Sequence, residues 1–325
     1  MEKNSNEKGR CRECPVIFGP VPSRRLGVSL GVDVVPRKVC SYDCAYCELG
    51  PTTYKTSERK EYIPEGEIAE AMEEYFRDAK TGLDFVTFSG SGEPTLHASL
   101  GRLIEKAKSL TDTPVAVLTN GSLLSDPRVR EELSAAEVVL PSLDAAREEA
   151  FLRINRPAKG IDLGGVIQGI HDFVADFEGE CRLEVLIAPD LNDSPEDIEA
   201  LARAISWIEP DLVQLGTLAR PPGPGLTAIR SLESEAMERI AARLREVATV
   251  QVVTGFEDRG WGGYEETKAE RITAMLKIRP VTLEDLSAST GLHATEVIKY
   301  LNALSDQYRI SEVEFMGKTY YSISV

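Results

Sequence analysis

A regular alternation of strand-like and helix-like segments between residues 26 and 254 constrains the fold of this chain more than any other feature. Six short runs are apolar or β-branched, as expected for parallel strands buried on both faces. They are VSLGVDVV (28–35), DFVTFS (84–89), PVAVLTN (114–120), EVVLPS (137–142), CRLEVLIA (181–188) and LVQLG (212–216). Apolar residues at helical spacing predict helices between them, at 65–79, 99–110, 165–177 and 194–208. Six successive βα units predict an α/β fold, a partial (β/α)6 barrel of the TIM type.

Chemically distinctive residues follow the predicted strands. Cys40–Cys47 follow the first strand and GSGEPT (90–95) the second, and the later strands are followed by Asn120, by Ser142 and Asp144, by Asn192, and by ARPPGPG (219–225). In parallel barrels the carboxyl ends of the strands form one face, and active sites lie on the loops of that face. We therefore expect these residues to converge on one site.

A change of pattern near residue 268 predicts a second, smaller domain. Helical segments begin at 268, 282 and 293, and the second has Thr282 and Asp285 at capping-box spacing. RISEVEFM and TYYSIS, joined by a Gly317-Lys318 turn, then predict a hairpin. Three helices and a hairpin indicate a winged helix. The expected organisation is an N-terminal extension at 1–25, a barrel at 26–258 and a winged-helix-like domain at 268–325, with a linker near 259–268.

The charge distribution argues against broad nucleic-acid binding. The net charge of the 325 residues is −16, whereas residues 1–60 hold 11 Lys and Arg against 7 Asp and Glu, a net of +4. An acidic surface repels a phosphate backbone, and only a local basic group, Arg24, Arg25, Arg37 and Lys38, stands out. No apolar run reaches the roughly 18–20 residues that cross a membrane, and the first ten residues lack a signal-like apolar region. We expect a cytoplasmic protein, whose six cysteines indicate metal or redox chemistry rather than disulfides.

Three of these cysteines, Cys40, Cys44 and Cys47, have the spacing C-x3-C-x2-C. A closed structural site usually has four protein ligands. Three thiolates on a four-iron cluster leave one iron without a protein ligand, and an open coordination position is what a catalytic metal site needs.

With this motif after the first strand and Gly92-Glu93-Pro94 after the second, the sequence resembles the radical S-adenosylmethionine (SAM) superfamily over residues 18–254. The resemblance implies a [4Fe-4S] cluster on Cys40, Cys44 and Cys47, with SAM chelating the open iron and a reductant such as flavodoxin or ferredoxin supplying the electron. It places Tyr46 beside the adenine and Gly92, Glu93 and Pro94 against the amino group of SAM. By the same resemblance Ser142 and Asn192 face the ribose or carboxylate. Asn120 and Asp144 either join the SAM site or serve as turn and capping residues.

Within the superfamily, FGPVPSRRLGVSLGVDVVPRKVCSYDCAYCELG, SGEPTLH, RINRP and QLGTLARPP resemble iron–sulfur oxidoreductases related to wyosine synthase, a tRNA-modifying enzyme. That enzyme has three further cysteines before its radical SAM motif, whereas this chain has Cys11 and Cys14. These two either bind an auxiliary cluster or zinc, with Cys181 as a further candidate ligand, or are free or redox-active thiols. Cys181 begins a buried strand and is expected in the core. The substrate is then a small metabolite or a protein, with tRNA as the alternative.

Arg153, Arg156 and Arg220 are either ligands of an anionic substrate group or partners in salt bridges. A different class of function, a redox-sensing DNA-binding regulator, would use the cluster as sensor and the winged helix as reader. A sensor does not need Gly92-Glu93-Pro94, and the third helix of the small domain has one lysine against Glu296 and Asp306, which suits phosphates poorly.

Overall fold

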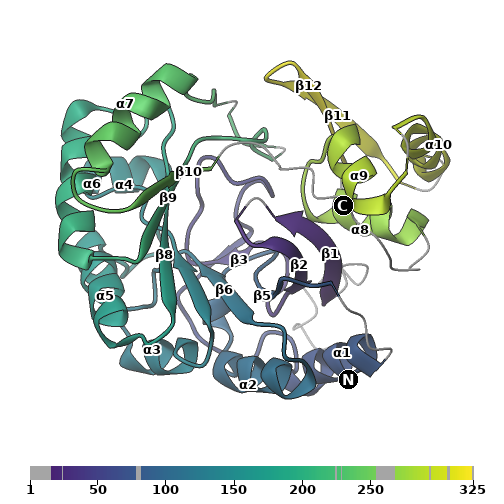
Figure 1. Cartoon of the computed structure of the whole chain (residues 1–325), viewed down its shortest axis with the longest axis horizontal. Helices are drawn as coiled ribbons and strands as arrows, with labels where there is room; N and C mark the ends of the chain where they lie inside the picture. Colours follow the sequence, from purple (N-terminus) through teal and green to yellow (C-terminus); the bar gives the residue numbers. More distant parts are fainter. Residues whose placement is uncertain are drawn as a thin grey trace, which may run out of the picture.

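The structure is a computed structural model that describes residues 16–23, 25–77, 82–223, 225–227, 229–253, 268–292, 294–305 and 308–323. A curved sheet dominates it, with helices around its convex side, and the C-terminal segment lies beside one edge of the sheet (Figure 1). Cys11, Cys14 and most of the predicted linker lie outside the described residues.

The central sheet has the strand order β1-β2-β5-β6-β7-β8-β9-β10 and is parallel from β2 to β10. Its strands are β1 Ile17–Ser23, β2 Gly27–Val32, β5 Phe85–Phe88, β6 Val115–Thr119, β7 Val138–Pro141, β8 Glu180–Leu186, β9 Leu212–Gly216 and β10 Val250–Val252. All six predicted strands are present. The mostly parallel α/β sheet confirms the fold class and is consistent with a partial barrel.

Two strands of the sheet were not predicted. β10 adds a seventh parallel strand, but it has three residues and too little pattern to be recognised. β1 pairs antiparallel with β2 and contains Pro20 and Pro22. Proline cannot donate to a ladder and is confined to edge strands, so its presence masks the strand in the sequence and suits its position at the edge.

In the described residues, seven helices alternate with the strands of the central sheet along the chain. They are α1 Glu65–Arg77, α2 Leu100–Leu110, α3 Pro127–Leu133, α4 Glu148–Ile154, α5 Leu163–Asp176, α6 Pro195–Ile208 and α7 Ser234–Leu244, with a short 3-10 turn at Pro94–Leu96. The four predicted helices correspond to α1, α2, α5 and α6. Two of the three that were not predicted, α3 and α4, have seven residues each, about two turns, which is too short for a clear apolar period.

Helix α6 illustrates how local sequence sets these elements. Ser194 caps it by accepting a hydrogen bond from the Asp197 N–H at 3.1 Å, and Pro195 occupies the first turn. Ile198, Leu201 and Ile205 form its buried face. Burial of such side chains from both helices and strands, each contributing about 1.5–3 kcal/mol, builds the main core.

The C-terminal segment has the predicted elements and its own apolar cluster. Helices α8 Lys268–Ile278, α9 Leu283–Thr290 and α10 Ala294–Ser305 precede the antiparallel pair β11 Ile310–Phe315 and β12 Lys318–Ile323. The Thr282–Asp285 capping box is present. The hairpin turn lies at Met316 and Gly317, both with positive φ, one residue earlier than predicted. Val21 of β1 packs against this second cluster, so the segment covers the sheet edge.

Among the described residues, no helix is both long and apolar enough to cross a membrane.

Candidate functional site

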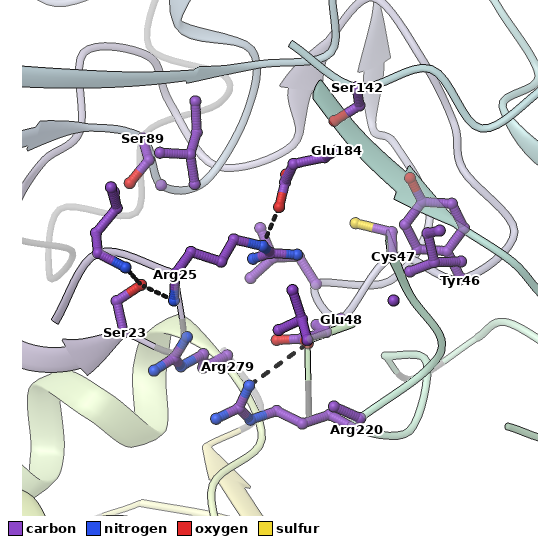
Figure 2. A pocket seen from close by; sticks show the side chains of 18 of the residues that line it. Ser23, Arg25, Tyr46, Cys47, Glu48, Ser89, Ser142, Glu184, Arg220 and Arg279 are labelled. Carbon is purple, nitrogen blue, oxygen red and sulfur yellow. Dashed lines mark hydrogen bonds and ion pairs between the residues drawn. The ribbon is translucent and has the colours of Figure 1, made fainter. Parts of the chain in front are cut away.

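A cavity of about 360 Å³ lies at the carboxyl ends of the parallel strands. Its wall includes Ser89 after β5, Ser142 and Asp144 after β7, Leu186 at the end of β8 and Thr217 after β9. Cys44, Tyr46 and Cys47 form one side of the cavity, and Ser23, Arg25 and the α8 residues Met275 and Ile278, with Arg279 just beyond, contribute to the other. Figure 2 shows Tyr46 and Cys47 across the cavity from Ser23 and Arg279.

The three cysteines lie on the segment between β2 and β4, residues 33–53, here named the cysteine loop. It includes the two-residue strand β3 Val39–Cys40, which pairs with β4 Tyr54–Lys55. The loop packs directly on Gly92, where a Cβ would lie 2.0 Å from the carbonyl oxygen of Val39. The N–H of Glu93 donates to that same oxygen at 3.1 Å. Glycine at 92 is therefore required for the close approach of the two predicted motifs.

Each cysteine sulfur accepts a hydrogen bond from one side-chain nitrogen. Asn120 Nδ2 is 3.6 Å from Cys40 Sγ, and Asn155 Nδ2 is 3.7 Å from Cys44 Sγ. Lys38 Nζ is 3.0 Å from Cys47 Sγ. These nitrogens come from the ends of β6 and α4 and from the cysteine loop itself.

Burial strongly affects two of the thiols. It raises the pKa of Cys40 to about 12, and the nearby Glu93 carboxylate adds to the effect. Burial, with Asp144 as the main charge, also raises the pKa of Cys44 well above its usual value. Without a bound cation both thiols are therefore protonated at neutral pH. A metal cluster that supplies positive charge would convert them to thiolates.

Glu93 is fully buried, and protein donors surround its carboxylate. Oε1 accepts hydrogen bonds from the N–H and Oγ1 of Thr95, at 3.1 and 2.6 Å, and from Thr119 Oγ1 at 2.6 Å. Oε2 accepts from the N–H of Asn120 at 2.8 Å. Desolvation raises the carboxyl pKa, and these hydrogen bonds oppose the shift. The carboxylate thus ties the Gly92–Pro94 segment to the end of β6, and it does not line the cavity.

Asp144 organises a second buried network. Its Oδ2 accepts hydrogen bonds from Tyr46 Oη at 2.6 Å and Asn155 Nδ2 at 2.7 Å, and Oδ1 accepts from the Leu186 N–H at 3.0 Å. Tyr46 and Asp144 both line the cavity. The network therefore holds the Tyr46 ring beside Cys47. Through Asp144 it also links this ring to Asn155, the donor to Cys44.

The prediction that Asn192 faces SAM is not supported by its position. Its side chain is 0 % exposed and does not line the cavity. Nδ2 donates to the carbonyls of Asp144 and Leu186, at 2.6 and 2.7 Å, and Oδ1 accepts from the Ala188 N–H at 2.8 Å. All of these partners are backbone groups, so Asn192 holds the ends of β7 and β8 in place.

The three predicted arginines have different environments. Arg220 lines the cavity, is 3 % exposed, and forms ion pairs with Glu48 at 3.7 Å and Asp285 at 3.4 Å. Arg153 instead donates to the Leu191 carbonyl and pairs with the buried Asp197. Arg156 is exposed, and neither it nor Arg153 lines the cavity. Of the two roles considered for Arg153, substrate ligand or salt-bridge partner, the structure contains the salt bridge.

Of the other predicted residues, Ser142 lines the cavity, and Asn120 lies beside the cysteine loop, where its Nδ2 also donates to Ser41 Oγ at 2.8 Å. Cys40, Gly92 and Pro94 are not among the residues that line the cavity. Cys181 is a buried core residue of β8, as expected.

Several cavity residues were not predicted from the sequence. Arg25 forms an ion pair with Glu184 across the cavity (Figure 2), and Met275, Ile278 and Arg279 come from a segment assigned to the other domain. Asn155 lies within RINRP, a motif noted only for its resemblance. For Arg25 and Lys38, the basic group of residues noted in the sequence was the one signal that could have pointed to the site.

Comparison with known proteins identifies the family. The model of the Radical SAM superfamily matches residues 34–205. A UPF0026 protein of Methanocaldococcus jannaschii is 30 % identical over 94 % of this chain and 95 % of its own length. A GTPase Obg of Brachyspira hyodysenteriae is 34 % identical over 95 % of this chain, but the chain spans only 45 % of that protein. A solved radical SAM methyltransferase from Sphaerobacter thermophilus shares the fold, with a TM-score of 0.51, 17 % identity, and coverage of 69 % of this chain and 65 % of its own.

Radical SAM enzymes use a [4Fe-4S] cluster and SAM, and the residues of this site fit those groups. In the described part of the chain no three His, Cys, Asp or Glu side chains converge on a single ion. Thiolates on three different corners of a cubane need not converge in that way. Three cysteines on one loop, each with a nitrogen donor to its sulfur, match the soft ligands that iron–sulfur clusters use. The chain therefore belongs to the radical SAM superfamily of enzymes and, within it, to the UPF0026 proteins.

Proposed function

We propose that this enzyme binds its [4Fe-4S] cluster through Cys40, Cys44 and Cys47, cleaves SAM reductively, and acts on a substrate held in the cavity. When bound, the cluster and SAM together supply a 5′-deoxyadenosyl radical that abstracts hydrogen. The observation that carries the proposal is that Cys44, Tyr46 and Cys47 line one cavity with Ser142 and Asp144, from strands far apart in the sequence.

The chain's own residues have separate roles in this proposal. Within Gly92–Pro94 we assign the backbone carbonyls, rather than the Glu93 carboxylate, to the ammonium group of SAM. Four protein donors already engage that carboxylate, whereas the Glu93 and Pro94 carbonyls each accept one N–H and keep a second lone pair. Tyr46, held by Asp144, offers its ring to the adenine. Ser142 is the polar group on the cavity wall that suits the ribose or carboxylate.

The substrate side of the cavity favours a small metabolite or a protein segment over tRNA. Helix α8 contributes to the wall there, and Arg25, Arg220 and Arg279 are accompanied by Glu48 and Glu184. The cavity lining is therefore mixed in charge, and the chain as a whole is acidic, neither of which suits a polyanion. tRNA base modification of the wyosine type stays as the alternative substrate class. The comparisons, which match radical SAM enzymes, do not support the DNA-binding regulator.

The domain organisation belongs to this proposal. We interpret residues 268–325 as a winged-helix-like domain that borders the substrate side of the barrel at 26–258. Radical SAM enzymes generally need an electron donor such as flavodoxin or ferredoxin. We propose the cytoplasm as the compartment, because thiols that hold the cluster must stay reduced.

Cysteine substitution tests the assignment. After anaerobic reconstitution, wild-type protein should contain about four irons and form 5′-deoxyadenosine from SAM with dithionite. The triple change of Cys40, Cys44 and Cys47 to Ala should abolish both. Cys181→Ala, a change of a buried cysteine in the core, is the matched control and should keep the iron. Retention of the same cluster in the triple variant would refute the proposal.

A further inference from the structure

The side-chain donors to the three cysteine sulfurs differ in charge, and Cys40 Sγ also accepts from the backbone N–H of Tyr42 at 3.4 Å. Asn120 and Asn155 present neutral amides to Cys40 and Cys44 at 3.6 and 3.7 Å. Lys38 presents an ammonium to Cys47 at 3.0 Å, the shortest of the three contacts. The hydrogen bond to Cys47 is therefore the one that carries a full positive charge, and charge-assisted hydrogen bonds are the stronger kind.

Lys38 is held in place by its surroundings. The residue is 5 % exposed, which is rare for lysine without a partner. Its N–H donates to the Ser91 carbonyl at 2.7 Å, and its own carbonyl accepts from the N–H groups of Thr53 and Tyr54 at 3.2 and 3.1 Å. Its φ of 59° is an uncommon conformation for a residue with a side chain. The Lys38 backbone is thus fixed between the Ser91 segment and the end of the cysteine loop.

The electrostatic surroundings of the cysteines make this cation consequential. Two buried carboxylates lie next to the other two sulfur donors: the Asn120 N–H binds Glu93 at 2.8 Å, and Asn155 Nδ2 binds Asp144 at 2.7 Å. Lys38 Nζ instead donates directly to Cys47. The hydrogen bond from Lys38 therefore brings a cation to a group of sulfurs whose amide donors are bound to carboxylates.

We propose that Lys38 raises the reduction potential of the cluster and so eases the entry of the electron that cleaves SAM. This rests on the proposed cluster at Cys40, Cys44 and Cys47. Reduction adds one electron, drawn from a low-potential donor of the flavodoxin or ferredoxin class, and makes or breaks no bond. The reduced state is more negative by one charge, so a fixed ammonium stabilises it more than the oxidised state. Net charge and hydrogen bonds to the sulfurs are known determinants of such potentials.

The test is a redox titration of anaerobically reconstituted full-length protein, followed by electron paramagnetic resonance. Lys38→Gln keeps a hydrogen-bond donor but removes the charge, and its midpoint potential should be lower than that of wild type. Lys38→Arg keeps the charge and should lie closer to wild type. Lys55→Gln is the matched control, because Lys55 donates to the Arg156 carbonyl rather than to a sulfur. The midpoint potential of the cluster in this variant should equal that of wild type.

Asn155→Ser supplies an independent comparison, because it weakens a neutral donor to Cys44. Its shift should be smaller than that of Lys38→Gln. Equal potentials for Lys38→Gln and wild type at equal iron content would overturn the proposal, as would a shift in Asn155→Ser as large as that in Lys38→Gln. So would loss of iron in Lys38→Gln with unchanged circular dichroism, since Lys38 would then serve assembly. Failure of wild type itself to take up a four-iron cluster would instead refute the proposed function.

Discussion

The two sides of the cavity are stabilised in different ways. On the cysteine side, Glu93 and Asp144 are buried carboxylates that each accept several hydrogen bonds between 2.6 and 3.1 Å. On the C-terminal side, apolar packing of α8 and α9 against β1 is joined by long ionic contacts of Arg220, at 3.4 and 3.7 Å. The first side is a hydrogen-bond network centred on two carboxylates, whereas the second combines apolar packing, two long ionic contacts and single hydrogen bonds to backbone carbonyls, such as that of Tyr320 Oη to Ala219 at 2.7 Å.

This difference matches the chemistry that each side is proposed to perform. A cluster and SAM have fixed shapes, so their site gains from side chains locked by hydrogen bonds. The substrate wall instead relies on apolar packing, and it is joined to the cysteine loop by Glu48, which pairs with Arg220, and by Arg37, which donates to the Lys277 carbonyl at 2.8 Å. The contrast predicts that substitutions on the cysteine side affect folding and cofactor binding together, whereas those on the C-terminal side affect mainly the wall.

Glu93→Ala should give the largest effect on stability. It leaves two backbone N–H groups and two threonine hydroxyls without their shared acceptor in a buried site, and we expect a loss of about 2–4 kcal/mol in unfolding free energy. Urea denaturation of the apo-protein measures this. Glu93→Gln keeps the shape and one acceptor oxygen, so it should lose less. A near-neutral Glu93→Ala would show that the network does not stabilise this side.

Asp33, in the cysteine loop, should make the free energy of unfolding depend on pH. It is buried, its Oδ2 accepts from the Ser91 N–H at 2.9 Å, and burial raises its pKa from 3.8 to about 6. The folded state therefore holds the proton more tightly than the unfolded state. The stability gained from the protonated form is complete below pH 4 and is lost as pH rises through 6. About 2 pKa units correspond to about 3 kcal/mol.

Comparison of wild type with Asp33→Asn between pH 4 and pH 7 measures this contribution. The asparagine retains an acceptor for Ser91 but does not ionise, so the variant should gain stability relative to wild type as pH rises. A difference between the two proteins that is independent of pH would contradict the assignment of a raised pKa.

Arg220→Met tests the C-terminal side. The side chain is buried, but Glu48 is partly exposed, so we expect a loss of about 1–3 kcal/mol, less than for a fully buried pair. Hydrogen exchange should increase in α9, where Asp285 loses its ion pair with Arg220 but keeps its capping contact with Thr282, while iron content after reconstitution stays near that of wild type. A parallel loss of iron would mean that the two sides are energetically one unit.

Arg153→Ala should have the smallest effect. The side chain is about half exposed and lies outside the cavity, and its partner Asp197 is buried but stays paired with Arg147 at 3.0 Å. We expect a change within about 0.5 kcal/mol and unchanged SAM affinity by anaerobic titration calorimetry. A clear loss of affinity would restore Arg153 as a ligand and extend the site beyond the cavity.

The sequence by itself determined the strands, the main helices and the two motifs. Strand and helix patterns depend on residues a few positions apart, and Cys40, Cys44 and Cys47 or Gly92 and Glu93 stand close together in the chain. Because both motifs follow parallel strands of one sheet, they lie together at the carboxyl ends of the strands. Elements without a clear period, such as the proline-containing β1 and the short α3, were not predictable in this way.

Only the tertiary structure decided which side chains meet. Asn155 reaches Cys44 across 111 positions, and Arg37 donates to the Lys277 carbonyl across 240. It also decided that Asn192 is buried behind the strand ends and that Met275 lines the cavity. Such contacts depend on how helices and loops pack in three dimensions. The residue type alone states that a group can donate, accept or carry charge, and the packing selects its partner.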